Sequence, residues 1–275
     1  MYRILYLGYS EKMLETLCKS NVFEVVSSIG TKGRISDRYY KLIEKYGVGY
    51  TEIQNKQELL EHIHLIEHID LVIMYKFEFI IPKEIVDKHL IINFHGGDLH
   101  SNRGAHAVVW SILLQETKTC LSCYRLSGGV DEGYLIDAYY VAISKDDNVL
   151  TLNEKLAEGI PQMLDSIESY LLGKKEPELI RGGKYRRKIE KNDYVIDVHR
   201  DTLDSIRAKI LSQQTYAGAI LILDEVEYRV KNYEILVLDE NRSGDRQLEV
   251  YNQYVDIYDG GKGLRLYLNS ESVRK

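Results

Sequence analysis

The chain has 275 residues, of which 44% are hydrophobic and 28% charged, a balance typical of a globular protein and unlike that of a disordered chain. Its 36 basic and 42 acidic side chains give a formal net charge of -6, which argues against non-specific binding of nucleic acid. No apolar run reaches the roughly 18 residues of a membrane-spanning helix, and the amino terminus lacks a secretory-signal pattern. The three cysteines are too few for a disulfide framework and fit a reducing cytoplasm, where we expect the protein.

The first half of the chain alternates strand and helix patterns. Short, nearly continuous apolar runs predict strands that are buried on both faces, as in parallel sheets. The strand candidates are residues 3–8, 23–29, 48–50, 70–75 and 90–94. Helical patterns lie between them, the first capped by Ser10. This alternation predicts an α/β fold with a Rossmann-like, mostly parallel twisted sheet flanked by helices.

The second half predicts a change of architecture. After a short helix that follows residue 105, two longer strands are expected at 119–126 and 134–143. Thr151 and Glu154 form a capping-box pattern, which predicts one long amphipathic helix that ends near Gly173. A polar, basic stretch then predicts a linker, and from Tyr216 onward a period of two predicts a small antiparallel β unit. We therefore expect two domains, residues 1–185 and 186–275.

The pattern most informative for chemistry lies at the end of a strand candidate, where Asn93 and His95 share one face of the strand. Ligands of open α/β sheets bind outside the carboxyl ends of strands, and Gly96 and Gly97 allow the backbone to turn and approach a ligand closely. An amide can stabilise an oxyanion and an imidazole can exchange a proton, so this pair suits acyl transfer. A histidine alone at this place would more often be structural than catalytic. Its pairing with Asn93 at the end of a strand favours a catalytic role instead.

A second candidate lies in the glycine-rich segment from residue 127 to 133, which holds Asp131 between two expected strands. A carboxylate there either orients His95 and stabilises its protonated form, or is an ordinary turn residue beside glycine. Spacing alone leaves both interpretations open.

These motifs resemble a known family. Asn93-Phe94-His95, Arg103-Gly104, Trp110 and the run from Gly129 to Gly133 are similar to the folate-dependent formyltransferases, most of all to the nucleotide-sugar N-formyltransferases. The family's catalytic trio then falls on Asn93, His95 and Asp131, within a Rossmann-like catalytic domain followed by a smaller domain. The chain departs from many members in carrying Gly96-Gly97 after the histidine and Leu99-His100 where a Leu-Pro pair is common. His100 is either a substrate contact or a solvated side chain.

The resemblance implies transfer of a formyl group from 10-formyltetrahydrofolate to the primary amine of a nucleotide-linked amino-dideoxy sugar, for polysaccharide biosynthesis. Asn93 would stabilise the oxyanion, His95 would act as the base and Asp131 would support it. The residues expected to bind folate are Lys76, Ile81, Gly129 and Val130. Gly96, Gly97 and Arg103 are expected to bind the acceptor, with a structural role equally open for Arg103. The expected partners are a small-molecule nucleotide sugar and a second copy in a homodimer, without nucleic acid or membrane.

The charge of the carboxy-terminal part distinguishes between the acceptors that members of the family use. Residues 200–275 hold 11 Lys and Arg against 13 Asp and Glu, without the basic stripe that tRNA phosphates would require. Three alternatives stay open: an aminoacyl-tRNA or ribonucleotide amine as acceptor, hydrolysis of formyltetrahydrofolate, and a binding module without enzymatic activity. Cys120 and Cys123 form a Cys-x-x-Cys pattern without a second pair, so we expect buried thiols and no metal site.

Overall fold

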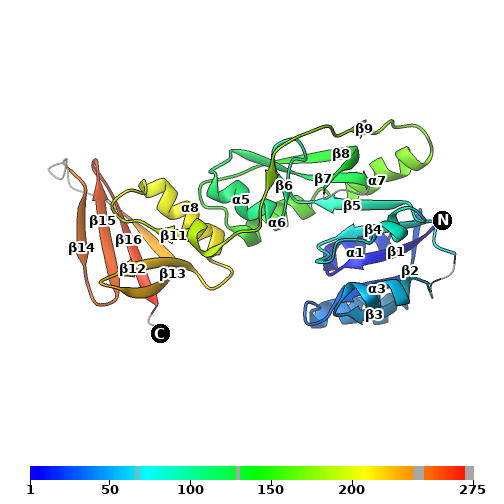
Figure 1. Cartoon of the computed structure of the whole chain (residues 1–275), viewed down its shortest axis with the longest axis horizontal. Coiled ribbons are helices and arrows are strands. Elements are labelled where there is room, and N and C mark those ends of the chain that lie inside the picture. Colours follow the sequence, from blue (N-terminus) through cyan, green and yellow to red (C-terminus); the bar gives the residue numbers. More distant parts are fainter. Residues whose placement is uncertain (65, 67, 128–130, 238–244, 270–275) are drawn as a thin grey trace. The chain divides into compact units, whose positions relative to one another are not determined.

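The computed structural model describes residues 1–64, 66, 68–127, 131–237 and 245–269. The chain forms two compact units (Figure 1). The first unit holds residues 1–104, 120–141 and 155–185, and the second holds residues 105–119, 142–154 and 186–275.

The first unit is built on an eight-stranded sheet with the order β3-β2-β1-β4-β5-β7-β8-β9, as far as the described residues show. Its strands are β1 (Tyr2–Gly8), β2 (Phe23–Thr31), β3 (Gly49–Ile53), β4 (Leu71–Tyr75), β5 (Ile91–His95), β7 (Lys118–Leu126), β8 (Gly133–Ala142) and β9 (Glu178–Leu179). The pairs from β3 to β5 are parallel, whereas β5 and β7 are antiparallel. The predicted α/β class with a mostly parallel sheet is confirmed.

The core of this unit explains why the apolar runs predict its strands. Leu5 and Leu7 of β1 lie beside Val72 and Met74 of β4 in register, and all four belong to one buried hydrophobic cluster. Every residue of β4 is buried, as expected for a strand with both faces covered. The sheet therefore forms where successive side chains can all leave water.

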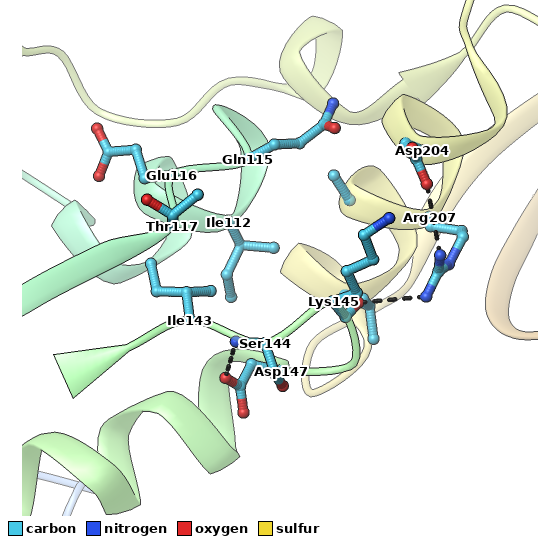
Figure 2. A pocket seen from close by; sticks show the side chains of 12 residues that line it. Ile112, Gln115, Glu116, Thr117, Ile143, Ser144, Lys145, Asp147, Asp204 and Arg207 are labelled. Carbon is cyan, nitrogen blue, oxygen red and sulfur yellow. Dashed lines mark hydrogen bonds and ion pairs between the residues drawn. The ribbon is translucent and has the colours of Figure 1, made fainter.

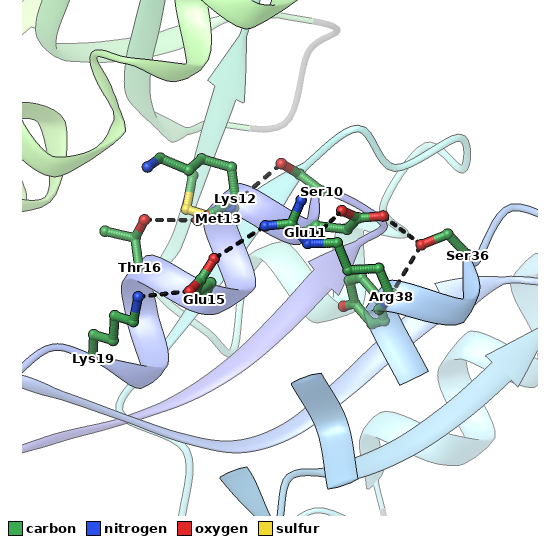
Figure 3. Close-up of polar contacts among 10 residues, drawn as sticks. Ser10, Glu11, Lys12, Met13, Glu15, Thr16, Lys19, Ser36 and Arg38 are labelled. Carbon is green, nitrogen blue, oxygen red and sulfur yellow. Dashed lines mark hydrogen bonds and ion pairs between the residues drawn. The ribbon is translucent and has the colours of Figure 1, made fainter. Parts of the chain in front are cut away.

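Helices flank the sheet: α1 (Glu11–Cys18), α2 (Asp37–Tyr46), α3 (Lys56–His64), α4 (Lys83–Val86) and α7 (Ile160–Leu171). Ser10 caps α1 by accepting the Met13 N–H, and Ser36 caps α2 in the same way. The Ser36 hydroxyl also donates to Glu11, whose carboxylate lies 3.3 Å from the Arg38 guanidinium, so polar contacts join the starts of the two helices (Figure 3).

The prediction of one long helix after residue 150 is wrong. The chain forms α6 (Val149–Ala157) and α7, with Gly159 between them and a proline in the first turn of α7. Proline is favoured at that position because it has no N–H to leave unpaired. Thr151 is also not the cap, since Asn148 accepts the N–H groups of Leu150 and Thr151.

The second unit contains a six-stranded sheet with the order β11-β12-β13-β16-β15-β14 in the described part of the chain. Its strands are β11 (Val195–Ile196), β12 (Ala219–Leu223), β13 (Val226–Leu236), β14 (Gln247–Val250), β15 (Tyr254–Asp259) and β16 (Lys262–Asn269). All its pairs are antiparallel except β11–β12, so the predicted carboxy-terminal antiparallel sheet is confirmed.

The helices α5 (Ala107–Leu113) and α8 (Leu203–Gln213) also belong to this unit. Ile206 and Ile210 of α8 pack in one cluster with Leu221, Val230 and Ile257 of the sheet. The remaining segments include β6 (Arg103–Gly104), β10 (Tyr185–Arg186) and the short helix η1 (Lys191–Tyr194). Among the described helices, none is long and apolar enough to cross a membrane.

Candidate active site

The site of the first unit begins at the carboxyl end of β5, where antiparallel pairing with β7 decides which side chains meet. Asn93 pairs with Tyr124 and His95 pairs with Ser122. Residues directly opposite each other in a sheet present their side chains on the same face. Tyr124 and Ser122 therefore extend the face that carries the amide and the imidazole.

His95 is buried, with 9% of its surface exposed, and both ring nitrogens face protein atoms. Nε2 lies 2.8 Å from the carbonyl oxygen of Asn102, and Nδ1 lies 3.6 Å from Oδ2 of Asp131. Because a carbonyl oxygen only accepts, this contact assigns the proton of the neutral ring to Nε2. Nδ1 is then the atom that can take a proton, and the Asp131 carboxylate faces the positive charge that results.

Asp131 is held in place by two donors. The N–H of Gly104 donates to Oδ2 at 2.7 Å, and the Tyr124 hydroxyl donates to Oδ1 at 2.8 Å. Its backbone has a φ of 50°, in the left-handed region that aspartate tolerates better than most residues. The structure thus brings the Asp131 carboxylate to the imidazole of His95, across 36 residues of sequence.

Asn93 joins the same group of side chains, because its Nδ2 donates to the Tyr124 hydroxyl at 2.7 Å. Tyr124 has no exposed surface, and burial followed by the nearby Asp131 charge raises its pKa well above the ordinary value. The phenol therefore stays protonated and can donate to Asp131. No local sequence pattern marks Tyr124 as part of this group, because only the register of β5 against β7 places it there.

Gly133 allows the backbone that follows Asp131 to lie close to β7. A Cβ atom at this position would lie 1.9 Å from the carbonyl oxygen of Arg125, far inside contact distance. At the other side of the loop's base, the Ser127 N–H donates to the Glu132 carbonyl at 3.2 Å. Only glycine permits this approach of backbone to backbone.

A family model described as Formyl transferase matches residues 17–166, more than half of the chain, and this range includes Asn93, His95 and Asp131. The chain belongs to the formyl transferase family. Methionyl-tRNA formyltransferase of Prochlorococcus marinus (strain MIT 9515) is 31% identical over 231 residues, which are 74% of this chain and 70% of that protein. The resemblance to formyltransferases that the motifs indicate is thereby confirmed.

Solved structures show the same fold. The sugar 3N-formyl transferase WlaRD, crystallised in the presence of dTDP and 5-N-formyl-THF, superposes with a TM-score of 0.72 at 18% identity, covering 98% of this chain and 99% of that one. HypX from Aquifex aeolicus in complex with tetrahydrofolic acid superposes with a TM-score of 0.68 at 18% identity. The match covers 98% of this chain but only 45% of HypX, so this formyl transferase family member spans less than half of that protein.

The residues expected to bind folate lie in two segments of this family member. Lys76 follows β4 with a φ of 55°, and its ammonium lies 5.6 Å from the centre of the Tyr75 ring. Burial lowers the pKa of Lys76. Ile81 is buried and packs in the core cluster of the sheet. Gly129 and Val130 lie outside the described residues, so folate binding by all four residues stays a prediction.

The residues expected to bind the acceptor follow β5. The Gly97 carbonyl accepts from the Ser122 hydroxyl at 2.8 Å, next to Gly96. The buried Arg103 guanidinium donates to the Gly183 carbonyl at 3.3 Å and lies 3.5 Å from the Glu132 carboxylate. Arg103 therefore holds segments around the site together, and its contact with an acceptor stays a prediction.

The structure also shows the contacts of His100 and of the Cys120 and Cys123 pair. His100 is exposed, and its Nε2 lies 3.8 Å from the Glu178 carboxylate. The thiols of Cys120 and Cys123 are both buried, and burial raises the pKa of Cys123 to about 12. A thiol with such a pKa holds little of the nucleophilic thiolate near neutral pH, so Cys123 is unreactive there.

The second unit has a pocket of its own, with a volume of about 170 Å³ (Figure 2). Residues at the end of α5, in the segment after β8 and on α8 line it. Its walls carry both signs of charge, with Lys145 and Arg207 beside Asp147 and Asp204, and Arg207 donates to Asp204 at 3.4 Å. None of its described lining residues is a predicted catalytic, folate or acceptor residue, so we place the candidate active site at β5 instead.

Proposed function

We propose that this protein transfers a formyl group from 10-formyltetrahydrofolate to the primary amine of a nucleotide-linked amino-dideoxy sugar. The observation that carries the proposal is the convergence of Asn93, His95 and Asp131 at the carboxyl end of β5 in a member of the formyl transferase family. An amide donor, a base and a carboxylate are the groups that acyl transfer to nitrogen requires.

Each of the three residues has one task in this reaction. As the amine nitrogen attacks the formyl carbon, the second N–H of the Asn93 amide donates to the oxygen on which negative charge develops. His95 accepts the proton of the attacking nitrogen at Nδ1, and Asp131, 3.6 Å away, stabilises the imidazolium. When the bond between the formyl carbon and the folate nitrogen breaks, that nitrogen takes the proton back from His95.

Two comparisons support folate as the donor, because HypX and WlaRD were crystallised with tetrahydrofolic acid and 5-N-formyl-THF. We assign folate binding to Lys76 and Ile81 after β4 and to Gly129 and Val130. The partly buried ammonium of Lys76 would gain from an anionic partner, and folate carries glutamate carboxylates.

Length and charge support a nucleotide sugar as the acceptor. The sugar 3N-formyl transferase WlaRD matches this chain over nearly the whole length of both proteins. Residues 200–275 have two more acidic than basic side chains, which would repel rather than bind a phosphate backbone. A small acceptor needs few phosphate contacts, and Gly96, Gly97 and Arg103 are the residues that we assign to it. We place the product in polysaccharide biosynthesis.

Methionyl-tRNA is the second candidate acceptor, favoured by the 31% identity to the methionyl-tRNA formyltransferase of Prochlorococcus marinus. It would use the same three residues, because the reaction at the amine is the same. The two candidates differ in salt dependence, since tRNA binding would weaken steeply as salt rises.

The deciding experiment incubates the purified protein and 10-formyltetrahydrofolate with separate acceptors: dTDP-, UDP- and GDP-linked amino sugars, charged methionyl-tRNA, and buffer alone. Mass spectrometry detects the addition of a formyl group. We expect formylation of an amino-sugar nucleotide that disappears in the His95→Asn variant. Formylation of methionyl-tRNA alone would establish the second candidate, and formate release without acceptor would indicate a hydrolase.

A further inference from the structure

Tyr124 contacts two of the three predicted catalytic residues but has no role of its own in the reaction described above. Its side chain is completely buried on β7, and its hydroxyl lies between Asn93 Nδ2 at 2.7 Å and Asp131 Oδ1 at 2.8 Å. A buried hydroxyl is expensive unless it is hydrogen-bonded, and here both of its bonds go to predicted catalytic groups.

The direction of these two bonds follows from their chemistry. An ionised carboxylate only accepts hydrogen bonds, so the single proton of the phenol is donated to Asp131. The phenol oxygen can then only accept from Asn93, which turns the amide nitrogen, rather than the amide oxygen, toward Tyr124. Without such a partner, the terminal torsion of asparagine is broad and roughly two-fold, and both orientations are populated.

We propose that Tyr124 is a positioning residue, which fixes the orientation of the Asn93 amide and holds the Asp131 carboxylate toward His95. The inference rests on the proposed formyl transfer and deepens it. One Nδ2–H of Asn93 is bound by the phenol, and the other donates to the developing oxyanion. The opposite orientation of the amide would present its oxygen to the oxyanion and repel it. A preorganised donor needs no reorientation during the reaction.

The same hydroxyl also aligns Asp131. Oδ1 accepts from Tyr124, while Oδ2 accepts from the Gly104 N–H and faces Nδ1 of His95. The two donors fix both oxygens and so the plane of the carboxylate. The oxyanion donor and the partner of the base are thus joined through one phenol, and removing it should affect both.

The test replaces Tyr124 by phenylalanine, which removes the hydroxyl and keeps the ring. We expect kcat to fall about tenfold to a hundredfold, the effect of one hydrogen bond to a charged group, with little change in KM for either substrate. Tyr39→Phe is the matched control. Tyr39 is equally buried, and its hydroxyl bonds Ser28 at 2.6 Å and the Gly8 carbonyl at 3.3 Å. It should lower the unfolding temperature to a similar degree while kcat is kept.

A double-mutant cycle separates positioning from a structural role. If Tyr124 acts through Asn93, then Tyr124→Phe lowers kcat by a clearly smaller factor in an Asn93→Ala background than in the wild type. Equal factors in both backgrounds would overturn the proposal, as would an unchanged kcat in Tyr124→Phe or an equal loss of kcat in Tyr39→Phe.

A readout without catalysis distinguishes this inference from the proposed function. In the wild type, NMR should detect one Asn93 side-chain amide proton that is protected from hydrogen exchange, and Tyr124→Phe should remove that protection. If protection is present but no acceptor is formylated, the proposed function fails and the positioning survives. If acceptors are formylated but no amide proton of Asn93 is protected, the positioning fails and the function survives.

Discussion

The charge of Asp131 can be tested by Asp131→Asn, which keeps the size of the side chain. The carboxylate oxygen lies 3.6 Å from Nδ1 of His95, and at an effective dielectric constant of about 20 two unit charges at that distance interact by about 4.6 kcal/mol. Without this charge the imidazolium that forms during proton transfer is less stable. At about 1.4 kcal/mol per tenfold change in rate, the reaction should slow by up to roughly a thousandfold. Asparagine also has only one acceptor oxygen for Gly104 and Tyr124, so one of these donors loses its partner.

We therefore expect kcat to fall about a hundredfold to a thousandfold, measured as formation of formylated acceptor at saturating concentrations of both substrates. Glu132→Gln is the control, because it removes the same charge from the next residue, whose side chain is 56% exposed. The Glu132 side chain is mostly exposed and its carboxylate lies 3.5 Å from Arg103, so kcat should stay near the wild-type value. A kcat for Asp131→Asn within tenfold of the wild type, with the fold intact by circular dichroism, would refute the role of the Asp131 charge.

Three further predictions follow from single contacts. Asn93→Ala removes the oxyanion donor and should lower kcat by about a hundredfold to a thousandfold, whereas a defect confined to KM would contradict that role. Gly133→Ala places a Cβ 1.9 Å from the Arg125 carbonyl and should destabilise the protein by at least about 1–3 kcal/mol in urea unfolding, and an unchanged midpoint would show that the loop adjusts freely. Burial and then Lys188 lower the pKa of His106 below 6.5, and Nδ1 accepts the Ile189 N–H at 3.4 Å. The unfolded chain thus binds this proton more tightly, and stability should fall as pH decreases through 6.5. Asparagine tolerates the φ of 62° at this position, so His106→Asn is a suitable variant. Its unfolding temperature should change less with pH between neutral and mildly acidic conditions than that of the wild type. An equally steep change in the variant would mean that other groups cause the pH dependence.

The elements that sequence predicts correctly are those whose pattern reflects a local cause. A run such as 70–75 is apolar at every position because β4 is covered on both faces. Ser10 precedes α1 because its side chain replaces a missing hydrogen-bond acceptor in the first turn. Both signals are complete within a few residues, so no knowledge of the rest of the fold is needed.

The failed predictions have local causes of a subtler kind. The apolar spacing from residue 152 to 171 suits one helix, but the chain breaks at Gly159 and resumes at Ile160. Residues 219–230 have the pattern of one strand but form a hairpin, because Asp224 and Glu225 both adopt positive φ between β12 and β13. Asp224 suits such a turn, but Glu225 stands where glycine is usual, so the sequence carries only a weak signal.

The strands of the sheet, and the place of Asn93 and His95 at the end of one of them, can be predicted from local patterns, because hydrophobic periodicity and strand alternation are properties of neighbouring residues. Three contacts are visible only in the folded protein: Asp131 faces Nδ1 of His95, the Asn102 carbonyl accepts from Nε2, and Tyr124 lies opposite Asn93. These contacts depend on the antiparallel register of β5 with β7 and on the return of a loop from far along the chain. Such pairings are selected by the packing of the whole unit, which no short segment encodes.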